Sequence, residues 1–371
     1  MNLVETFPGL YIHVPFCIKK CKYCDFVSYT GMENEHEKYV DALLEEAEKY
    51  KNTKVDTVFI GGGTPTCLAP ATMDRLLEGI RKIFCILSDA EFSVEANPGT
   101  VSDEKLRILK NSGVNRLSIG VQSFDDEQLK LLGRIHDKSC ALKTIENANK
   151  YFSNINIDIM TAIPHQSAES LMATLQTAVN TGAKHLSCYS LIIEDGTEFH
   201  KLYSEGCLEL CTEDEDRSMF SELCGYLAQQ GYERYEISNF AKDGARCRHN
   251  MKYWKTEEYI GLGAAAHSYM DFKRYYNFSD LKKYISSPGV PEEVIELSID
   301  DRMSEYVIMA LRTSDGVSYN EFKNRFGKNF NEVYPEKLKK YEKFLKQTPD
   351  GFALTDCGFD ISNSIMCQFI L

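Results

Sequence analysis

The chain of 371 residues lacks the long apolar run that a membrane span requires. No stretch of about 18 consecutive apolar residues occurs in it. Met1–Phe16 contains no basic segment followed by an apolar core, so the sequence predicts no signal peptide. Basic residues are outnumbered by acidic ones. The chain has 42 Lys and Arg and 55 Asp and Glu, which gives a net charge of −13. General nucleic-acid binding needs a basic surface that neutralises phosphates, so we expect no nucleic-acid partner.

Several cofactor motifs are missing as well. The chain has neither the G-K-[ST] of a P-loop nor a dinucleotide G-x-G-x-x-G motif. It has no pair of C-x₂-C knuckles for structural zinc, and its C-x₃-C pair, Cys207 and Cys211, lies far from a third partner. Thirteen cysteines without an export signal indicate a reducing compartment, in which thiols serve metals, chemistry or packing. We therefore expect a cytoplasmic protein.

Apolar, β-branched runs alternate with amphipathic segments of helical period over the first half of the chain. The predicted strands are Leu10–Val14, Thr57–Ile60, Glu91–Val94, Arg116–Ile119, Asn156–Met160 and His185–Ile193. The predicted helices between them are Glu35–Lys51, Pro70–Phe84, Ser102–Ser112, Asp125–Leu132, Lys138–Phe152 and Ala168–Thr181. Such βα units predict an α/β fold whose parallel sheet curls into a partial (β/α)6 barrel of the TIM type. Chemistry on such a fold takes place at the C-terminal ends of the strands.

The pattern changes after about Glu194. We expect a barrel core over residues 1–195, a barrel extension with an aromatic and polar block over 196–290, and a small helix-rich, winged-helix-like domain over 291–371. The run SPGVP, Ser287–Pro291, predicts a linker, and GFALTDCGFDI, residues 351–361, predicts a short hairpin. The lysines of the last part are matched by acidic residues, so its shape does not favour DNA binding.

Three cysteines follow the first predicted strand directly. Cys17, Cys21 and Cys24 read C-x₃-C-x₂-C, and Phe26 occupies the position at which a further thiol would continue the pattern. Structural zinc usually takes four ligands, and C-x-x-C redox chemistry would leave Cys17 unexplained. A [4Fe–4S] cube held by three thiolates keeps one iron open for an exogenous ligand. The segment therefore favours a cluster that a small molecule completes, and a structural zinc site is the alternative.

Further candidate residues lie at the ends of the next predicted strands. The run FIGGGTPT, Phe59–Thr66, would expose backbone amides and carbonyls to a close ligand because glycine has no Cβ. Glu95 and Gln122 end the following strands, Arg134 comes twelve residues later, and Asp158 lies inside an apolar strand. A lone buried Asp is costly unless it is paired or bound. We therefore expect these side chains to share one pocket, with a charge pair between Arg134 and Asp158.

These motifs resemble the radical S-adenosylmethionine (SAM) superfamily, in which three cysteines hold a [4Fe–4S] cluster and SAM chelates the fourth iron. In that superfamily the reduced cluster cleaves SAM to a radical. The resemblance implies that Cys17, Cys21 and Cys24 are the cluster ligands and that the GGTP segment holds the amino group of SAM. It also implies a SAM site made of Tyr11, Tyr23, Gly62, Gly63, Thr64, Glu95, Gln122, Arg134 and Asp158.

The sequence is more similar still to the HemW group, haem chaperones related to oxygen-independent coproporphyrinogen III oxidase. The similarity is dense from about Gly9 to Tyr269 and rests on YIHVPFC, GGGTPT, GVNRLSIGVQSF, YERYEISNFA, CRHNMKYW and YIGLGAAAHS. It implies a chaperone that binds haem, transfers it to an acceptor haemoprotein and carries a [4Fe–4S] cluster with exchangeable SAM. Relatives work near respiratory complexes, which implies peripheral membrane association, although we find no strongly basic amphipathic helix.

The block H-N-x-x-Y-W contains the residues that favour haem. His249 and Tyr253 are four residues apart, so they share a face of a helix, and both types of side chain bind haem iron. Trp254, the only tryptophan, offers a flat apolar surface. The resemblance therefore implies haem contacts for His249, Tyr253 and Trp254. Cys247 and His267 are further candidates, although we expect the small-residue run around His267 to serve close packing.

The alternative function is that of the oxidase itself, an oxidative decarboxylase that uses SAM. Two departures disfavour it. Phe26 replaces the last cysteine of the oxidase motif, and sixteen residues precede Cys17 where the oxidase has a longer segment. A shorter segment would cover the cavity less well, whereas radical chemistry needs water kept out.

Overall fold

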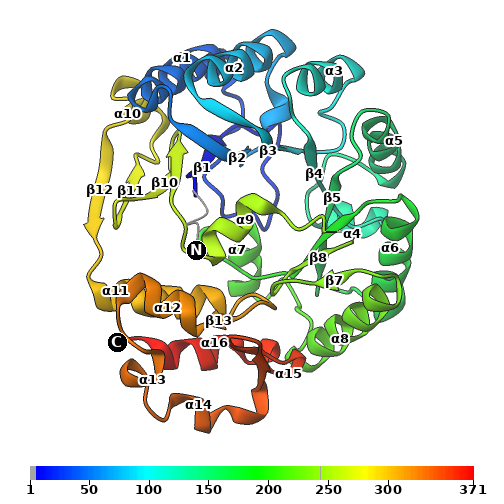
Figure 1. Ribbon diagram of the computed structural model, residues 1–371. Helices are drawn as coiled ribbons and strands as arrows, with labels where there is room; N and C mark the ends of the chain where they lie inside the picture. Colours follow the sequence, from blue (N-terminus) through cyan, green and yellow to red (C-terminus); the bar gives the residue numbers. More distant parts are fainter. Residues whose placement is uncertain (1–5, 243) are drawn as a thin grey trace.

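Six parallel strands form the wall of a partial barrel in the computed structural model, which describes residues 6–242 and 244–371 (Figure 1). In sheet order they are β1 (Gly9–Val14), β2 (Lys54–Gly62), β3 (Cys85–Ala96), β4 (Arg116–Gln122), β5 (Ile155–Thr161) and β6 (His185–Ser190). Each pairs with the next in parallel register. The predicted α/β barrel is therefore confirmed.

Helices cover the outer face of this sheet (Figure 1). They are α1 (His36–Ala47), α2 (Pro70–Ile83), α3 (Asp103–Asn111), α4 (Asp126–Leu131), α5 (Lys138–Asn149) and α6 (Ala168–Asn180). Several begin where the sequence supplies an N-cap, since the side chains of Ser102, Asp125, Asp137 and Ser167 accept hydrogen bonds from backbone amides of the first turn. The caps explain why these helices start within a residue of their predicted positions.

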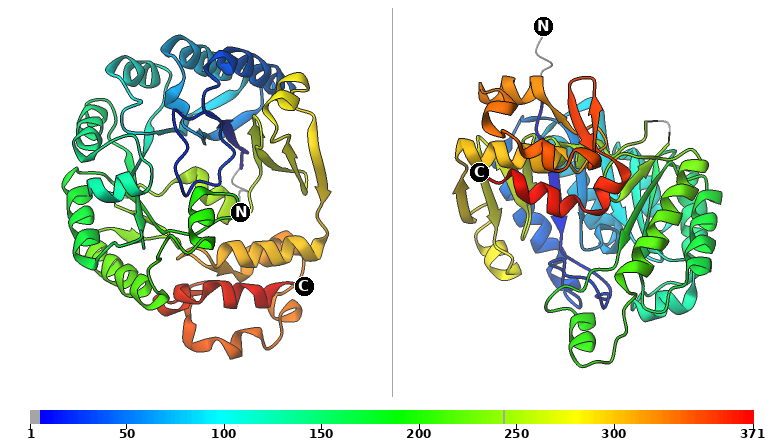
Figure 2. Two further views of the ribbon diagram at one scale, coloured as in Figure 1. Left: turned by 180° about the vertical axis from the view of Figure 1, so that it is seen from behind. Right: turned by 90° about the horizontal axis from the view of Figure 1, so that it is seen from below.

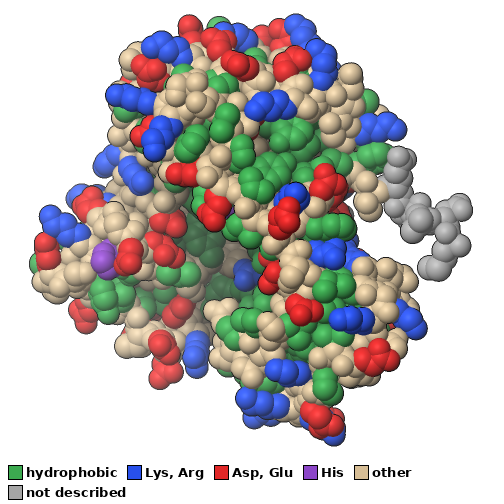
Figure 3. Space-filling view, turned by 90° about the vertical axis from the view of Figure 1, so that its left-hand side faces the viewer, with side chains coloured by type: hydrophobic (Ala, Val, Ile, Leu, Met, Phe, Trp, Pro, Cys, Tyr) green, Lys and Arg blue, Asp and Glu red, His purple; other side chains and the backbone are tan. Residues whose placement is uncertain are grey.

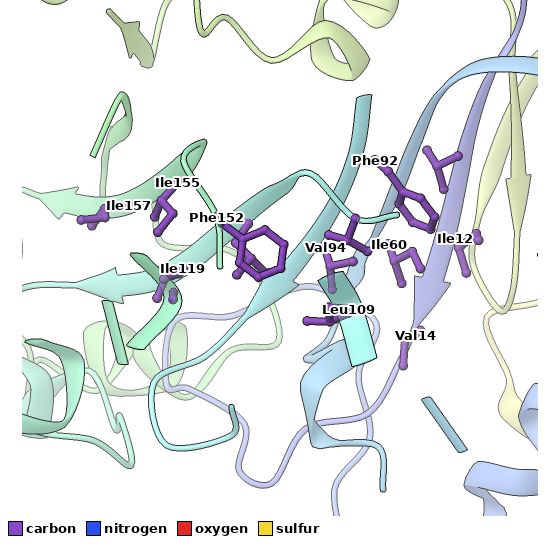
Figure 4. Close-up of a cluster of buried hydrophobic side chains, with 14 of the residues drawn as sticks. Ile12, Val14, Ile60, Phe92, Val94, Leu109, Ile119, Phe152, Ile155 and Ile157 are labelled. Atoms are coloured by element: carbon purple, nitrogen blue, oxygen red, sulfur yellow. The ribbon is translucent and has the colours of Figure 1, made fainter. Parts of the chain in front are cut away.

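The main core lies between the strands and these helices (Figure 4). In β1, alternation directs Leu10, Ile12 and Val14 into this core, whereas Tyr11 and His13 lie on the inner face of the barrel. The outer layer of the wall is therefore apolar. Its inner face is left to polar and aromatic side chains, which gives the barrel an interior suited to chemistry.

Among the described residues, additional strands extend the sheet at both ends to twelve strands. Beside β1 lie β9 (Tyr259–Leu262), which is parallel to it, and then β10 (His267–Met270), β11 (Lys273–Asn277) and β12 (Pro291–Glu296), which are antiparallel to their neighbours. Beside β6 lie β8 (Asn239–Ala241) and β7 (Glu233–Arg234). The helices of this part are α7 (Glu198–Ser204), α8 (Glu213–Gln229), α9 (Arg248–Trp254) and α10 (Leu281–Ser286). Of these, α9 lies in the middle of the ring of strands in Figure 1.

The C-terminal residues close the ring between the two ends of the sheet (Figures 1 and 2). Their elements are α11 (Ile299–Ala310), β13 (Val317–Ser318), α12 (Tyr319–Phe326), α13 (Phe330–Val333), α14 (Lys337–Lys340), β14 (Leu345–Thr348), β15 (Gly351–Leu354), α15 (Asp356–Asp360) and α16 (Ser362–Met366). They have their own apolar cluster, which includes Phe322, Phe330 and Phe352. The predicted division of the chain into 1–195, 196–290 and 291–371 stays a prediction; β12, in the last range, pairs with the main sheet.

One detail of the C-terminal prediction was wrong. The hairpin was expected over residues 351–361, but it is formed by β14 and β15, so that its turn precedes Gly351. The segment after β15 is helical, because the side chain of Thr355 caps α15 by accepting a hydrogen bond from the amide of Gly358. Among the described residues no helix combines the length and the apolar character that crossing a bilayer requires.

A buried carboxylate fastens the sheet extension to the barrel. Glu46 of α1, only 3% exposed, accepts hydrogen bonds from the amide of Gly263 at 2.9 Å, from the Asn277 side chain at 2.7 Å and from the Tyr284 hydroxyl at 2.6 Å. These donors come from the β9–β10 connection, from β11 and from α10. One side chain near the start of the chain therefore holds three segments that all come after position 259.

We predict that Glu46→Ala lowers the free energy of unfolding by about 3 kcal/mol or more, because each buried donor left without a partner costs about 1–3 kcal/mol. The neighbouring Glu45→Ala is the control, since Glu45 is exposed. Urea unfolding followed by circular dichroism measures both. If the two variants agreed within about 0.5 kcal/mol, Glu46 would not hold the extension.

Candidate cluster and cofactor site

A cavity of about 450 Å³ opens at the C-terminal ends of the strands. Ten of the predicted site residues line it: Cys17, Cys21, Tyr23, Cys24, Gly62, Gly63, Glu95, Gln122, Arg134 and Asp158. Tyr11 and Thr64 are not among the lining residues. Residues from β1 to β6 and their loops therefore meet at the edge of the sheet where chemistry was expected.

The loop that carries the three cysteines is closed by backbone hydrogen bonds. The amide of Cys17 donates to the carbonyl oxygen of Tyr29 at 2.9 Å, and the amide of Tyr29 donates to that of Pro15 at 2.7 Å. Across the cavity, the amide of Lys22 donates to the carbonyl oxygen of Leu132 at 3.1 Å. The thiols are thus held between the end of β1 and the segment that leads to Arg134.

The chemistry around the thiols suits a metal cluster. Arg134 donates from Nη1 to Cys21 Sγ at 3.3 Å, and Thr64 Oγ1 lies 3.4 Å from Cys17 Sγ. Burial raises the pKa of Cys17 and raises that of Cys24 to about 11, so metal binding would have to displace their protons. No group of three His, Cys, Asp or Glu in the described part of the chain is arranged around a single ion. A [4Fe–4S] cube does not need such an arrangement, because each of its thiolates binds a different iron.

The glycines at the end of β2 permit a close approach between two backbones. Gly62 has φ +102°, and a Cβ on Gly63 would lie 2.7 Å from the carbonyl oxygen of Phe16. The amides of this segment were expected to be open to a ligand, but they are engaged. The Gly62 amide donates to Glu95 Oε2 at 3.0 Å, that of Gly63 to Val14 O at 3.0 Å, and that of Thr64 to Phe16 O at 2.7 Å. The glycines therefore allow the end of β2 to pack closely against the start of the cysteine loop.

Two carboxyl groups face the cavity from β3 and β5. Burial, and then the charge of Asp158, raise the pKa of Glu95 to about 7. Burial also raises the pKa of Asp158, although hydrogen bonds from Asn156 and Ser187 lower it in part. A cationic ligand in the cavity would stabilise the charged form of both carboxyl groups and lower their pKa values.

The predicted charge pair between Arg134 and Asp158 does not form among the described residues. Arg134 donates instead from Nη2 to Asn97 Oδ1 at 2.6 Å and to the carbonyl oxygen of Gly120, besides its contact with Cys21. Asn97 also donates to Thr64 Oγ1 at 2.7 Å, so that one amide links the arginine to the glycine segment. Asn97 was not among the residues predicted for the site. The signal that would have found it is its position directly after β3, where Glu95 was recognised.

Another residue that was missed orients Gln122. Tyr189 on β6 lines the cavity and donates from its hydroxyl to Gln122 Oε1 at 2.7 Å. Gln122 has φ +72°, an uncommon conformation for a residue other than glycine. The bond fixes which end of the amide points into the cavity.

A chain of hydrogen bonds runs from Asp158 through the barrel interior to α9. Asn156 donates to Asp158 Oδ1 at 2.6 Å, and Asn156 Oδ1 lies 2.5 Å from His185 Nδ1. His185 Nε2 is 2.7 Å from the Tyr235 hydroxyl, which accepts from the amide of Cys247 at 3.2 Å. The cavity and the first turn of α9 are therefore connected by side chains that are buried and bonded.

The H-N-x-x-Y-W block forms α9, and its histidine is buried. His249 is 1% exposed; its Nδ1 lies 2.9 Å from Thr57 Oγ1 and its Nε2 lies 2.8 Å from the Tyr253 hydroxyl. Trp254 packs beneath the guanidinium of Arg312, 4.5 Å from its ring centre. None of the three predicted haem residues lines the cavity at the strand ends. In this conformation iron reaches neither nitrogen of His249 without breaking a hydrogen bond.

The mouth of the cavity carries exposed apolar side chains. Phe26 is 64% exposed and Ile192 is 67% exposed, and both line the opening. Phe26 occupies the position at which the cysteine pattern stops. Large exposed apolar residues beside a polar cavity favour a ligand with an apolar surface.

Comparison with known proteins agrees with this architecture. Residues 11–178 match the radical SAM superfamily, and residues 297–361 match the HemN C-terminal domain. The chain is 36% identical over 372 residues to the heme chaperone HemW of Bacillus subtilis, which covers 97% of this chain and 98% of the relative. It is 35% identical over 366 residues to the heme chaperone HemW of Lactococcus lactis, which covers 97% of each.

A solved structure shares the whole fold. Coproporphyrinogen III oxidase (HemN) from Escherichia coli, described as a radical SAM enzyme, aligns with a TM-score of 0.86 over 99% of this chain and 90% of that chain. The identity is 24%. At that level the likeness shows the fold, including the C-terminal part that closes the ring.

We predict that His249 makes stability depend on pH. Burial, and then the charges of Lys252 and Arg116, lower the pKa of His249 to about 3, against about 6.5 in an unfolded chain. Between these values the unfolded state takes up a proton that the folded state does not, so stability falls as the pH falls below about 6.5. His249→Gln removes this titration. Between about pH 7 and about pH 5, the free energy of unfolding of His249→Gln should decline less steeply than that of the wild type. The difference between the two slopes should be at most about 1.4 kcal/mol per pH unit.

Urea unfolding of the wild type and His249→Gln at both pH values measures the difference. Comparison of slopes rather than of absolute stabilities removes the cost of the lost imidazole contacts. Parallel slopes would mean that His249 is protonated in the folded protein as readily as in the unfolded chain.

Proposed function

The chain belongs to the HemW family of radical SAM proteins, and from this membership we propose that it binds haem and hands it to an acceptor haemoprotein. The proposal includes a [4Fe–4S] cluster and an exchangeable SAM molecule. The observation that carries it is the cavity at the strand ends, which Cys17, Cys21 and Cys24 share with Glu95 and Arg134. Three thiols, a cation and a buried carboxyl in one cavity suit a cluster with an additional ligand.

In this proposal the cluster is held by the three thiolates. Arg134, which contacts Cys21, offsets negative charge on the sulfur, and Thr64 lies within reach of Cys17. When bound, a cluster with an open iron can coordinate SAM and exchange electrons with it. The exposed side chain of Phe26 adds no ligand, which leaves that iron open.

The SAM site that we propose uses the predicted residues in two roles. Those that line the cavity would contact SAM directly: Tyr23, Gly62, Gly63, Glu95, Gln122, Arg134 and Asp158. Tyr11 and Thr64 would support the site from behind, Tyr11 through His13 at 2.9 Å and Thr64 through Asn97. The sulfonium of SAM is a cation, which suits a cavity where burial raises the pKa values of both Glu95 and Asp158 and the charge of Asp158 raises that of Glu95 further.

Haem is proposed as cargo. The relatives' name, heme chaperone, supports haem as the ligand, and the exposed Phe26 and Ile192 at the mouth of the cavity offer apolar surface to a porphyrin. The proposed location is the cytoplasm, with peripheral membrane association during transfer.

We predict that each of Cys17→Ala, Cys21→Ala and Cys24→Ala abolishes reconstitution of the cluster, since each thiolate is proposed to hold one iron. Cys67→Ala is the matched control: its thiol is half-buried nearby, donates to Phe16 O at 3.4 Å and does not line the cavity. The measurement is iron and sulfide content after anaerobic reconstitution. An electron paramagnetic resonance spectrum of the reduced wild type should also change when SAM is added. Zinc without sulfide in the wild type would indicate the structural zinc alternative.

We predict that the reconstituted wild type binds haemin stoichiometrically, with a saturable shift of the Soret band. The same preparation, incubated anaerobically with coproporphyrinogen III, SAM and a reductant, should form no protoporphyrinogen. Haem binding without decarboxylation distinguishes the chaperone from the oxidase. Decarboxylation at a catalytic rate, or the absence of saturable haemin binding, would contradict the proposed function.

A further inference from the structure

Cys21 borders two separate hollows of the protein. One is the cofactor cavity at the strand ends, and the other is a smaller hollow whose lining includes Ile18, Lys19, Arg134 and Ile135. In the described part of the chain, the other two cysteines of the loop line the first hollow alone. Arg134 lines both, so its guanidinium and the Cys21 thiol form part of the partition between them.

The smaller hollow offers an approach to the cysteine loop that the cofactor does not use. In the proposed function SAM fills the larger cavity. A group that exchanges electrons with a cluster on this loop must then come close from another direction. Cys21 is the thiol that such a group can reach through the smaller hollow.

The rim of the smaller hollow is apolar, exposed and held in place. Ile18 is 56% exposed and Ile135 is 48% exposed, on two segments that are far apart in the sequence. These segments are tied together, because the amide of Lys22 donates to the carbonyl oxygen of Leu132 at 3.1 Å. A Cβ on Gly133 would lie 3.0 Å from Lys22 Cγ, so the contact is close. Exposed apolar side chains around a hollow favour contact with another molecule.

The cysteine loop is basic, although the whole chain has a net charge of −13. The ten residues Cys17–Phe26 include three lysines and one acidic residue. Among the described residues, Lys22 forms an ion pair with Glu198 at 3.2 Å, whereas Lys19 and Lys20 are exposed and pair with no carboxylate. Elsewhere, as on the face seen in Figure 3, basic and acidic side chains are interspersed. A partner at this loop is therefore expected to be acidic.

A small protein fits this surface better than a membrane does. The start of α7 packs against the cysteine loop, where the amide of Phe199 donates to the carbonyl oxygen of Lys22 at 2.9 Å. This part of the chain is acidic and exposed, with Glu194, Asp195 and Glu198. A flat anionic membrane that reached the lysines of the loop would also meet these carboxylates. A small protein can contact the rim of the smaller hollow alone.

We propose that the surface formed by Ile18, Lys19, Lys20 and Ile135 docks a small acidic protein that carries single electrons. The inference rests on the proposed cluster. In the step, the docked carrier loses one electron and the cluster gains it, so that no bond between atoms forms or breaks and no proton moves. Arg134, which donates to Cys21 Sγ at 3.3 Å, places a positive charge beside the thiol that borders the hollow and so favours the added negative charge.

The test uses a plant-type [2Fe–2S] ferredoxin as the probe, because it is an acidic one-electron carrier of low potential. Lys19→Glu/Lys20→Glu reverses the charge of the surface. Lys328→Glu/Lys346→Glu is the matched control, since it makes the same change of net charge on two exposed lysines of the C-terminal part. Ile135→Glu changes the rim from a segment without a cysteine, which keeps the test valid if the double variant at the loop fails to hold a cluster.

Two measurements are made on each full-length protein. Calorimetry gives the Kd for oxidised ferredoxin before and after cluster reconstitution. Stopped-flow absorbance gives the rate constant for electron transfer from reduced ferredoxin. Iron and sulfide content, together with reduction by dithionite, shows that each cluster is intact, and circular dichroism checks the fold.

We expect Lys19→Glu/Lys20→Glu to lower the rate constant about tenfold or more at low salt, with a smaller difference at high salt. Ile135→Glu should raise the Kd about tenfold. The control pair should match the wild type within about twofold. Dithionite should reduce every intact cluster to the same extent, because it needs no docking surface.

Equal rate constants for the loop variant and the control, with an unchanged Kd for Ile135→Glu, would overturn the inference and leave the proposed function standing. The same holds if the wild type does not bind ferredoxin. A loop variant that changes only the sedimentation coefficient of the chain would assign the surface to a second copy and would also overturn the inference. If the wild type takes up no iron and sulfide, the proposed function fails and the inference fails with it.

Discussion

The site depends on one close approach between two backbones, where the end of β2 meets the loop that follows β1. Gly62 adopts a left-handed conformation and Gly63 leaves no room for a Cβ against Phe16, so that the amides of Gly63 and Thr64 bond to Val14 and Phe16. These contacts bring Thr64 to Cys17 and, through Asn97, to Arg134 and hence to Cys21. A side chain at position 63 would separate the strand from the loop and disperse the thiols.

The interior of the barrel imposes the second constraint. Its wall is apolar on the outside, so the polar groups inside must satisfy one another. The series from Asp158 through Asn156, His185 and Tyr235 to Cys247 meets this requirement. It also ties the cofactor cavity to α9, because each member has a protein partner on either side. A buried network of this kind tolerates the loss of a member poorly, since the remaining groups are left without partners.

The sequence predicted the barrel well because hydrophobic period and N-caps act locally. The run Asn156–Met160 became β5 with one added residue at each end, and Ser102 began α3 where expected. What could not be predicted were partners that depend on register and loop geometry. Arg134 was paired with Asp158 by charge alone, whereas the loop beyond α4 carries it to Cys21 and Asn97. His249 was chosen by residue type, and only the fold shows that Thr57 and Tyr253 already occupy both of its nitrogens.

The ring of elements around the cavity is completed by a segment that follows all strands of the main sheet in the sequence. β7 and β12 are the two edges of this sheet, and α11 with the segment after it bridges them. Glu305 of α11 forms an ion pair with Arg274 of β11, and the amide of Ser314, in the segment after α11, donates to Tyr235 O at 2.9 Å. This bridging segment packs on an apolar cluster of its own, separate from the main core. Loosening it would therefore open the flank of the barrel without unpairing any strand of the main sheet.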